Sequence, residues 1–145
     1  MGGDPTNAGG RSLEVAKVEV VVGSIQFNAR DAELLYSFPK PASDVATIVR
    51  CFVFLNRAAP PSFGELTSCL TKGLRAGIIR EDGGRFVIDD NWYGRIHKAD
   101  ATAENEIEAM LEFESGFVSV DFDETTAAAC AITEEEYESV LAKLR

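Results

Sequence analysis

The sequence predicts a single α+β domain, because three different patterns follow one another along the chain. Residues 13–40 begin with the apolar alternation of strands, and residues 41–98 contain two helix patterns and a hairpin signal. Residues 99–145 contain a helix, a strand and a second helix. The length of 145 residues suits one domain, expected at 13–145. Residues 1–12 are rich in glycine and have no long apolar run, so we expect a flexible tail there.

The first part of the domain is expected to be a pair of strands. Valine occupies every second position in Val18–Val22, and the apolar pattern continues to the end of Leu13–Phe27. This spacing fits two short strands or a hairpin. A short helical pattern follows at Asp31–Phe38 and ends before Pro39, because a residue that precedes proline avoids the helical conformation.

A second helix is expected from about Asp44 to Arg57, with Ser43 as its cap. Its apolar side chains recur at helical spacing and share one face. They are Val45, Ile48, Val49, Phe52 and Leu55. Because Val53 and Phe54 widen that face, we expect this helix to be buried on most sides.

A third helix begins at Ser62, because Ser62 and Glu65 form the capping-box pattern of a helix start. Gly77 stands where a glycine ends a helix. The side chains expected to face inward are Leu66, Cys69, Leu70 and Leu74. Two short strands follow on either side of Asp82-Gly83, which is a strong hairpin turn signal.

The C-terminal part is expected to be a helix, a strand and a helix. Thr102 is placed to cap a helix to about Ser115, with Ile107, Met110 and Leu111 facing inward. A strand is expected at Phe117–Asp123. A second capping box, Thr133–Glu136, opens a helix with one apolar face. That face consists of Tyr137, Val140, Leu141 and Leu144.

The segment Leu74–Arg80 (LRAGIIR) ends a helix at a glycine, and Gly84–Ile88 (GRFVI) completes the hairpin after it. This order of helix, turn, helix and hairpin, within residues 41–98, resembles the winged-helix family. The resemblance implies that the helix before the glycine packs on the core and that the hairpin is the wing. Members of the family usually have two helices between the first helix and the wing. The family includes DNA readers and protein-docking modules, so the resemblance leaves the function open.

The helices that come before the expected wing can be assigned in two ways. Pro61–Ile79 has room for one long helix or for two very short ones. Alternatively, Asp31–Phe38 supplies the first of the three helices, and the long helix at Asp44–Arg57 is the middle one.

Charge is unevenly distributed along the chain. Residues 99–145 hold 13 of the 24 acidic residues and only two bases, which gives a net charge of −11. Residues 41–98 carry +2 and residues 1–40 carry −1, so a mildly basic middle precedes a strongly acidic end. Such asymmetry bears on the choice of partner rather than on the fold.

The basic middle leads to the first functional hypothesis, a weak DNA-binding transcriptional regulator. Its candidate DNA-binding residues are Lys72, Arg75, Arg80 and Arg85, on or beside the third helix and the hairpin. In the winged-helix arrangement these elements supply bases to DNA phosphates. Because four bases release few counterions, the affinity for double-stranded DNA would be modest and sensitive to salt. A homodimer would double the basic face.

The acidic part leads to an alternative hypothesis, a protein-binding module of the adaptor, inhibitor or immunity type. Its candidate residues are Glu104, Glu108 and Glu112, which could present a negative surface to a basic protein. Surface acids also serve solubility, and the glutamates at 134–136 stabilise a helix start.

Catalytic and metal-binding patterns are weak, so we expect a protein that is not an enzyme and needs no cofactor. His97 is the only histidine, and the three cysteines are not in metal-ligand spacing. The sequence contains no glycine-rich phosphate loop. No apolar run reaches the length of a membrane span, and the odd number of cysteines without an export signal indicates a cytoplasmic protein.

Overall fold

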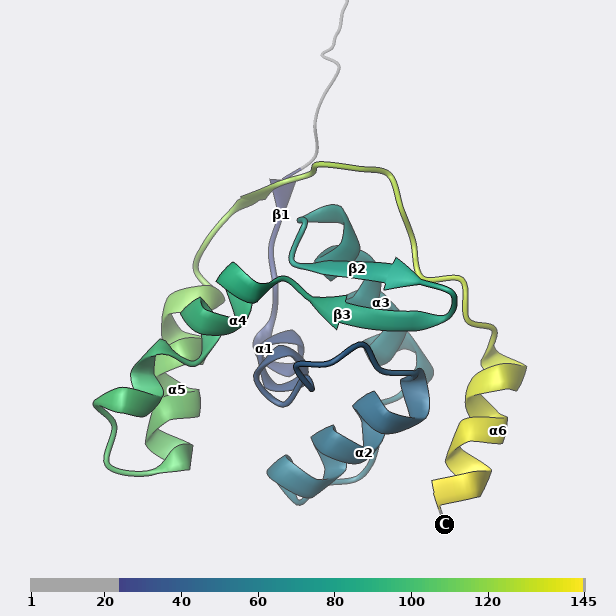
Figure 1. Ribbon diagram of the computed structural model, residues 1–145, viewed down its shortest axis with the longest axis horizontal. Helices are drawn as coiled ribbons and strands as arrows, with labels where there is room; N and C mark the ends of the chain where they lie inside the picture. Colours follow the sequence, from purple (N-terminus) through teal and green to yellow (C-terminus); the bar gives the residue numbers. More distant parts are fainter. Residues whose placement is uncertain (1–23, 145) are drawn as a thin grey trace, which may run out of the picture.

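The structure is a computed structural model that describes residues 24–144, which form a single α+β domain (Figure 1). The expected tail at 1–12 and most of the expected strand pair, at 13–23, lie outside these residues. In chain order the elements are β1 (Ser24–Ile25), α1 (Ala29–Tyr36), α2 (Val45–Asn56), α3 (Phe63–Arg75), β2 (Ile79–Asp82), β3 (Arg85–Ile88), α4 (Asp90–Ile96), η1 (Lys98–Ala101), α5 (Glu106–Phe117), β4 (Phe122–Asp123) and α6 (Glu134–Leu144).

The one described strand of the N-terminal part pairs with a distant segment. β1 and β4 are antiparallel, with Ser24 opposite Asp123 and Ile25 opposite Phe122. The ring of Phe27, which follows β1, packs against Phe117 and Phe122 with centroid distances of 4.7 and 5.2 Å. The beginning and the acidic end of the domain therefore share one core.

α1 begins at a capping box that the sequence analysis did not single out. The side chain of Asn28 accepts a hydrogen bond from the Asp31 backbone, and the Asp31 carboxylate accepts one from the Asn28 backbone, at 2.8 and 2.9 Å. Two free N–H groups of the helix start are satisfied in this way. The inner face of α1 is fully buried and includes Leu34 and Leu35.

α2 has the expected core face, with Val45, Ile48, Val49 and Phe52 buried. Two expectations for it are wrong. Its cap is Asp44, whose carboxylate accepts from the Thr47 backbone at 2.9 Å, because the Ser43 backbone is paired with the hairpin instead. Phe54 is 82% exposed, since none of the described elements covers that side of α2.

α3 is one long helix, and its capping box is confirmed. Ser62 Oγ accepts from the Glu65 backbone at 3.0 Å, and the Glu65 carboxylate accepts from the Ser62 backbone at 2.8 Å. The expected inward side chains are buried; they are Leu66, Cys69, Leu70 and Leu74. Gly77 follows with a φ of 77°, a left-handed conformation that glycine adopts without strain.

A hairpin forms as the sequence predicts, but its two turn residues are Gly83 and Gly84 rather than Asp82-Gly83, because Asp82 belongs to β2. β2 and β3 are antiparallel, with Ile79 opposite Ile88 and Asp82 opposite Arg85. Ser43 adds an isolated bridge to this hairpin, with mutual backbone hydrogen bonds to Phe86 at 2.8 and 2.9 Å. The segment before α2 is thereby fixed to the far strand of the hairpin.

α4 and η1 follow the hairpin, and the sequence analysis did not predict them. Asp89 caps α4, because its carboxylate accepts from the Trp92 backbone at 3.2 Å. Trp92 lies against Phe117 and Phe122, with centroid distances of 6.3 and 5.5 Å. Trp92 therefore serves packing.

α5 begins and faces differently from the prediction. Its cap is Asn105 rather than Thr102, and it continues to Phe117, so the strand expected at Phe117–Asp123 is reduced to the two residues of β4. Ile107 and Leu111, expected to face inward, are 68% and 56% exposed. Ala109 and Phe117 are the buried residues of α5.

α6 packs against α2, on the opposite side of the molecule from α5 (Figure 1). The capping box of Thr133 and Glu136 is confirmed, with two hydrogen bonds of 2.8 and 3.1 Å. Tyr137 is fully buried, and its hydroxyl donates to the Pro61 carbonyl at 2.6 Å. The expected order of helix, strand and helix after the hairpin is therefore present, preceded by α4.

Replacement of Leu74 by alanine tests the packing of α3. We expect Leu74→Ala to lower the free energy of unfolding by about 2–5 kcal/mol, because the side chain is buried against the core. The matched control is Leu111→Ala on the exposed face of α5, with an expected change within about 0.5 kcal/mol. Urea denaturation measures both, and equal losses would contradict the assignment of the two faces.

Candidate nucleic-acid and partner-binding surfaces

The four candidate DNA-binding bases differ in their surroundings. Lys72, on α3, is engaged within the protein: its Nζ lies 2.6 Å from Asp31 Oδ2 and donates to the Gln26 carbonyl at 3.2 Å. The Asp31 side chain is only 2% exposed. Lys72 therefore neutralises a buried carboxylate on α1, which is a structural task.

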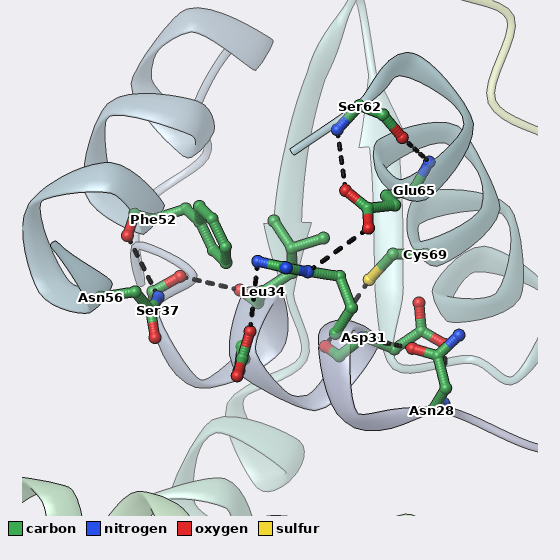
Figure 2. A network of polar contacts seen from close by, with 11 residues as sticks. Asn28, Asp31, Leu34, Ser37, Phe52, Asn56, Ser62, Glu65 and Cys69 are labelled. Carbon is green, nitrogen blue, oxygen red and sulfur yellow. Dashed lines mark hydrogen bonds and ion pairs between the residues drawn. The ribbon is translucent and has the colours of Figure 1, made fainter. Parts of the chain in front are cut away.

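Asp31 is part of a polar network between α1 and α3 (Figure 2). Its backbone carbonyl accepts from the Cys69 thiol at 3.8 Å, and its side chain holds the Asn28 cap. Burial raises the pKa of the Cys69 thiol well above its usual range, so this cysteine is kept protonated. The neighbouring Arg30 forms an ion pair with Glu65 at 3.5 Å, which adds a second link between the two helices.

Arg75, at the end of α3, is also engaged within the protein. Its Nε donates to the Ala128 carbonyl at 2.9 Å, and its Nη1 lies 3.5 Å from Glu124 Oε2. Its own carbonyl accepts from the backbone and the hydroxyl of Thr125, at 2.7 and 2.9 Å. Residues 124–132, which connect β4 to α6 and are called the crossing segment below, therefore lie against the last turn of α3.

Arg80 and Arg85 are exposed on the hairpin. Arg80 is opposite Val87, and Arg85 is opposite Asp82. Because residues two apart on a strand point to the same side, Arg85 lies on the same face as Val87, and the two arginines therefore share one face of the hairpin. Arg85 also lies near Asp44. The pKa of Asp44 is lowered first by its hydrogen bonds to Thr47, and to a smaller degree by the charges of Arg85 and Arg50.

The structure thus divides the four bases into two pairs. Within residues 24–144, Arg80 and Arg85 are exposed and form no ion pair, whereas Lys72 and Arg75 contact other parts of the chain. Sequence analysis missed the residues that engage Arg75, because nothing in the sequence of the crossing segment indicates which helix it lies on. The sequence carries only the signal that this segment is a loop.

The three candidate protein-binding glutamates are exposed at the start and along the outer side of α5. Glu108 accepts from the Glu104 backbone at 2.5 Å, so it also supports the helix start. Among residues 24–144, no basic side chain lies within ion-pair distance of Glu104, Glu108 or Glu112. The exposed Ile107 and Leu111 lie on the same helix, so its outer side is both acidic and apolar.

His97 belongs to a small polar cluster. Its Nδ1 lies 3.1 Å from Asp100 Oδ2, and the Tyr36 hydroxyl donates to Asp100 Oδ1 at 2.6 Å. Burial, followed by this hydrogen bond and the charge of Asp100, raises the pKa of Tyr36. Among residues 24–144, the buried Nε2 atom of His97 has no hydrogen-bond partner. Because Asp100 is the partner of Nδ1 and no described nucleophile is hydrogen-bonded to the ring, this part of the chain does not form the arrangement that acyl transfer requires.

The cysteines and acids do not gather into a metal centre. Within the described residues, no group of three or more His, Cys, Asp or Glu side chains is placed to hold a metal ion. Partial burial raises the pKa of Cys130, as full burial does for Cys69, so neither thiol is activated.

Comparison of the chain with protein-family models, with curated proteins and with solved structures found no match. Over residues 24–144, the helices are too short or too polar to cross a bilayer.

Substitution of Lys72 separates its structural task from a binding task. We expect Lys72→Met to lower the free energy of unfolding by about 1–3 kcal/mol, because it leaves the buried Asp31 carboxylate without its cation. The control is Arg80→Met on the exposed hairpin, with a change within about 0.5 kcal/mol. Thermal and urea denaturation measure both, and an unchanged stability of Lys72→Met would show that the ion pair contributes nothing.

Proposed function

We propose that this chain is a regulatory protein of winged-helix type, which acts by binding double-stranded DNA weakly rather than by catalysis. The observation that carries the proposal is the order α1, α2, α3 and hairpin, with two arginines on the exposed face of that hairpin. The winged-helix resemblance implies this order, in which α2 and α3 stand between the first helix and the wing.

The packing of these elements also supports the proposal. α1 contacts both α2 and α3, and α3 contacts β2, so the three helices and the hairpin form one unit. A side chain at Gly73 would meet Ile79, with 2.5 Å between its Cβ and Ile79 Cδ1, which shows how closely α3 approaches the hairpin. A wing fixed on its helix in this way can present Arg80 and Arg85 to a phosphate backbone.

The expected DNA affinity is modest. With two free bases on the hairpin, the slope of log K against log salt is about −2, since each neutralised phosphate contributes about −0.9. The acidic helices α5 and α6 lie on either side of the hairpin in Figure 1 and would oppose a close approach of DNA along their surfaces. The proposal also places the protein in the cytoplasm, where its three free cysteines would remain reduced.

Removal of the hairpin arginines tests the proposal. We expect Arg80→Ala and Arg85→Ala each to weaken the binding of a labelled random duplex and to make the salt slope about one unit less steep. Fluorescence anisotropy at low and moderate salt measures both quantities. Arg57→Ala, an exposed arginine at the end of α2, is the matched control for net charge. The proposal fails if the wild-type chain binds no duplex at low salt, or if the control weakens binding as much as the hairpin variants.

A second candidate function is docking of a basic protein on α5. The specific observation is that Ile107 and Leu111 are largely exposed beside Glu104, Glu108 and Glu112. Apolar side chains bordered by acids suit a helix with lysine or arginine around an apolar stripe. In this case the winged-helix arrangement serves as a scaffold.

Charge reversal tests this second function. We expect Glu112→Lys to slow the association of a synthetic leucine- and lysine-containing helical peptide at low salt, and to leave the unfolding transition unchanged. The control is Glu138→Lys, which makes the same change of charge on α6. Stopped-flow fluorescence gives the rates, and equal rates for both variants and the wild type would remove the α5 surface as a docking site.

A further inference from the structure

The crossing segment takes a long path over the molecule. It leaves β4 beside β1, passes the hairpin and reaches α6 on the other side (Figure 1). Residues 124–132 belong to no helix or strand, and most of their side chains are exposed. Its exposed part is held in place by specific polar contacts, whereas Cys130 and Ile132 near its end pack against the core.

Those contacts converge on the outer side of α3. Thr125 donates to the Arg75 carbonyl from both its backbone and its hydroxyl, and Arg75 returns a hydrogen bond to the Ala128 carbonyl. One turn earlier, Thr71 Oγ1 accepts from the Cys130 backbone at 3.0 Å. Because Thr71 and Arg75 are four residues apart, they lie on one face of α3, and the crossing segment runs along that face.

The second base of α3 is held by the neighbouring strands. Lys72 donates to the Gln26 carbonyl beside β1, and the Gln26 side chain donates to Asp121 at 2.5 Å, just before β4. Asp121, Asp123 and Glu124 bring three negative charges to this edge of the domain. Both bases of α3 therefore meet carboxylates or carbonyls of the chain itself.

We propose that the crossing segment is an autoinhibitory cover of α3, which duplex DNA has to displace before Arg75 can contact a phosphate. This inference rests on the proposed DNA-binding function and specifies its regulation. In the closed arrangement, the hairpin arginines can contact DNA phosphates but Arg75 cannot. In the open arrangement, the outer face of α3 can contact them as well.

Local opening is compatible with the rest of the fold. The cover is anchored at both ends, by the pairing of β4 with β1 and by the buried Tyr137 of α6. Between these anchors Ala127, Ala128 and Ala129 are exposed, so lifting them uncovers little apolar surface, and opening of the whole segment also exposes the half-buried Cys130 and Ile132. DNA then binds the open form, and its apparent affinity is reduced by the fraction of molecules that are closed.

A disulfide that holds the crossing segment on α3 gives a direct and reversible test, called the lock below. Cys130 already supplies one of its two cysteines. Thr71→Cys places a second thiol beside Cys130, at the position of a hydroxyl that now lies 3.0 Å from the Cys130 backbone nitrogen. We expect the oxidised, cross-linked protein to bind a labelled random duplex at least about tenfold more weakly than the same protein after reduction. Thr71→Cys with Cys130→Ser cannot form the lock and should bind equally under both conditions.

A release variant tests the same inference without a cross-link. Thr125→Pro removes both donors to the Arg75 carbonyl at an exposed position, so we expect about tenfold tighter DNA binding. We also expect a salt slope about one unit steeper, since Arg75 is freed. Addition of Arg75→Ala to Thr125→Pro should remove this gain, because the gain depends on the α3 base.

The outcomes separate the two proposals. If the oxidised and reduced Thr71→Cys proteins bind DNA equally, or if the gain of Thr125→Pro persists without Arg75, the cover is overturned while the hairpin proposal stands. If the wild type binds no duplex at low salt, the DNA-binding proposal itself fails and the cover fails with it. A weaker locked form together with an Arg75-dependent gain supports both.

Discussion

The buried carboxylate of Asp31 is the interaction on which the arrangement of the helices depends. A carboxylate that is 2% exposed requires hydrogen bonds and a cation, and here it receives the Asn28 N–H and the Lys72 ammonium. These two partners fix the start of α1 against the middle of α3. The same constraint removes Lys72 from the surface available to a ligand, because its withdrawal would leave Asp31 buried and unpaired. A base that reads as a DNA contact in the sequence is thus committed to the fold.

An aromatic cluster joins the basic middle of the chain to its acidic end. Phe27 follows the first strand, Trp92 comes from α4, and Phe117 and Phe122 come from the acidic part, with ring centroids 4.7–6.3 Å apart. Because such rings bury large areas, this cluster accounts for the packing of α5 and β4 against α4 and the segment after β1. The acidic residues are therefore part of the domain rather than an appended tail, and their charges act at short range on the basic middle.

Most features that depend on neighbouring residues could be predicted from the sequence, whereas contacts between distant segments could not. The capping boxes at Ser62 and Thr133, the core face of α2 and the position of the hairpin all depend on neighbours in sequence, and the structure confirms them, although the turn is Gly83-Gly84 rather than Asp82-Gly83. The predictions for α5 failed because its apolar residues are spread around the helix, so periodicity chose Ile107 and Leu111 although Ala109 and Phe117 are buried. Ser43 was taken as a cap because the sequence does not show that its backbone pairs with Phe86. The separation of the candidate bases into free and engaged pairs was equally hidden, since it arises from contacts 41 to 53 residues apart in sequence.

These contacts show at which distances the acidic part of the chain acts on the basic middle. A net charge of −10 opposes DNA binding at long range, but salt screens such repulsion beyond about 8–10 Å, and the contacts within a few ångströms then decide. Glu124 at 3.5 Å from Arg75 competes directly with a phosphate for the same guanidinium, and the Ala128 carbonyl occupies another of its donors. Because the ion pair is partly exposed, it is weak in isolation, and the competition is one that an array of phosphates can win. In the proposed autoinhibition, Glu124 and the Ala128 carbonyl thus lower the apparent affinity for DNA by occupying Arg75, while the core of the fold stays unaffected.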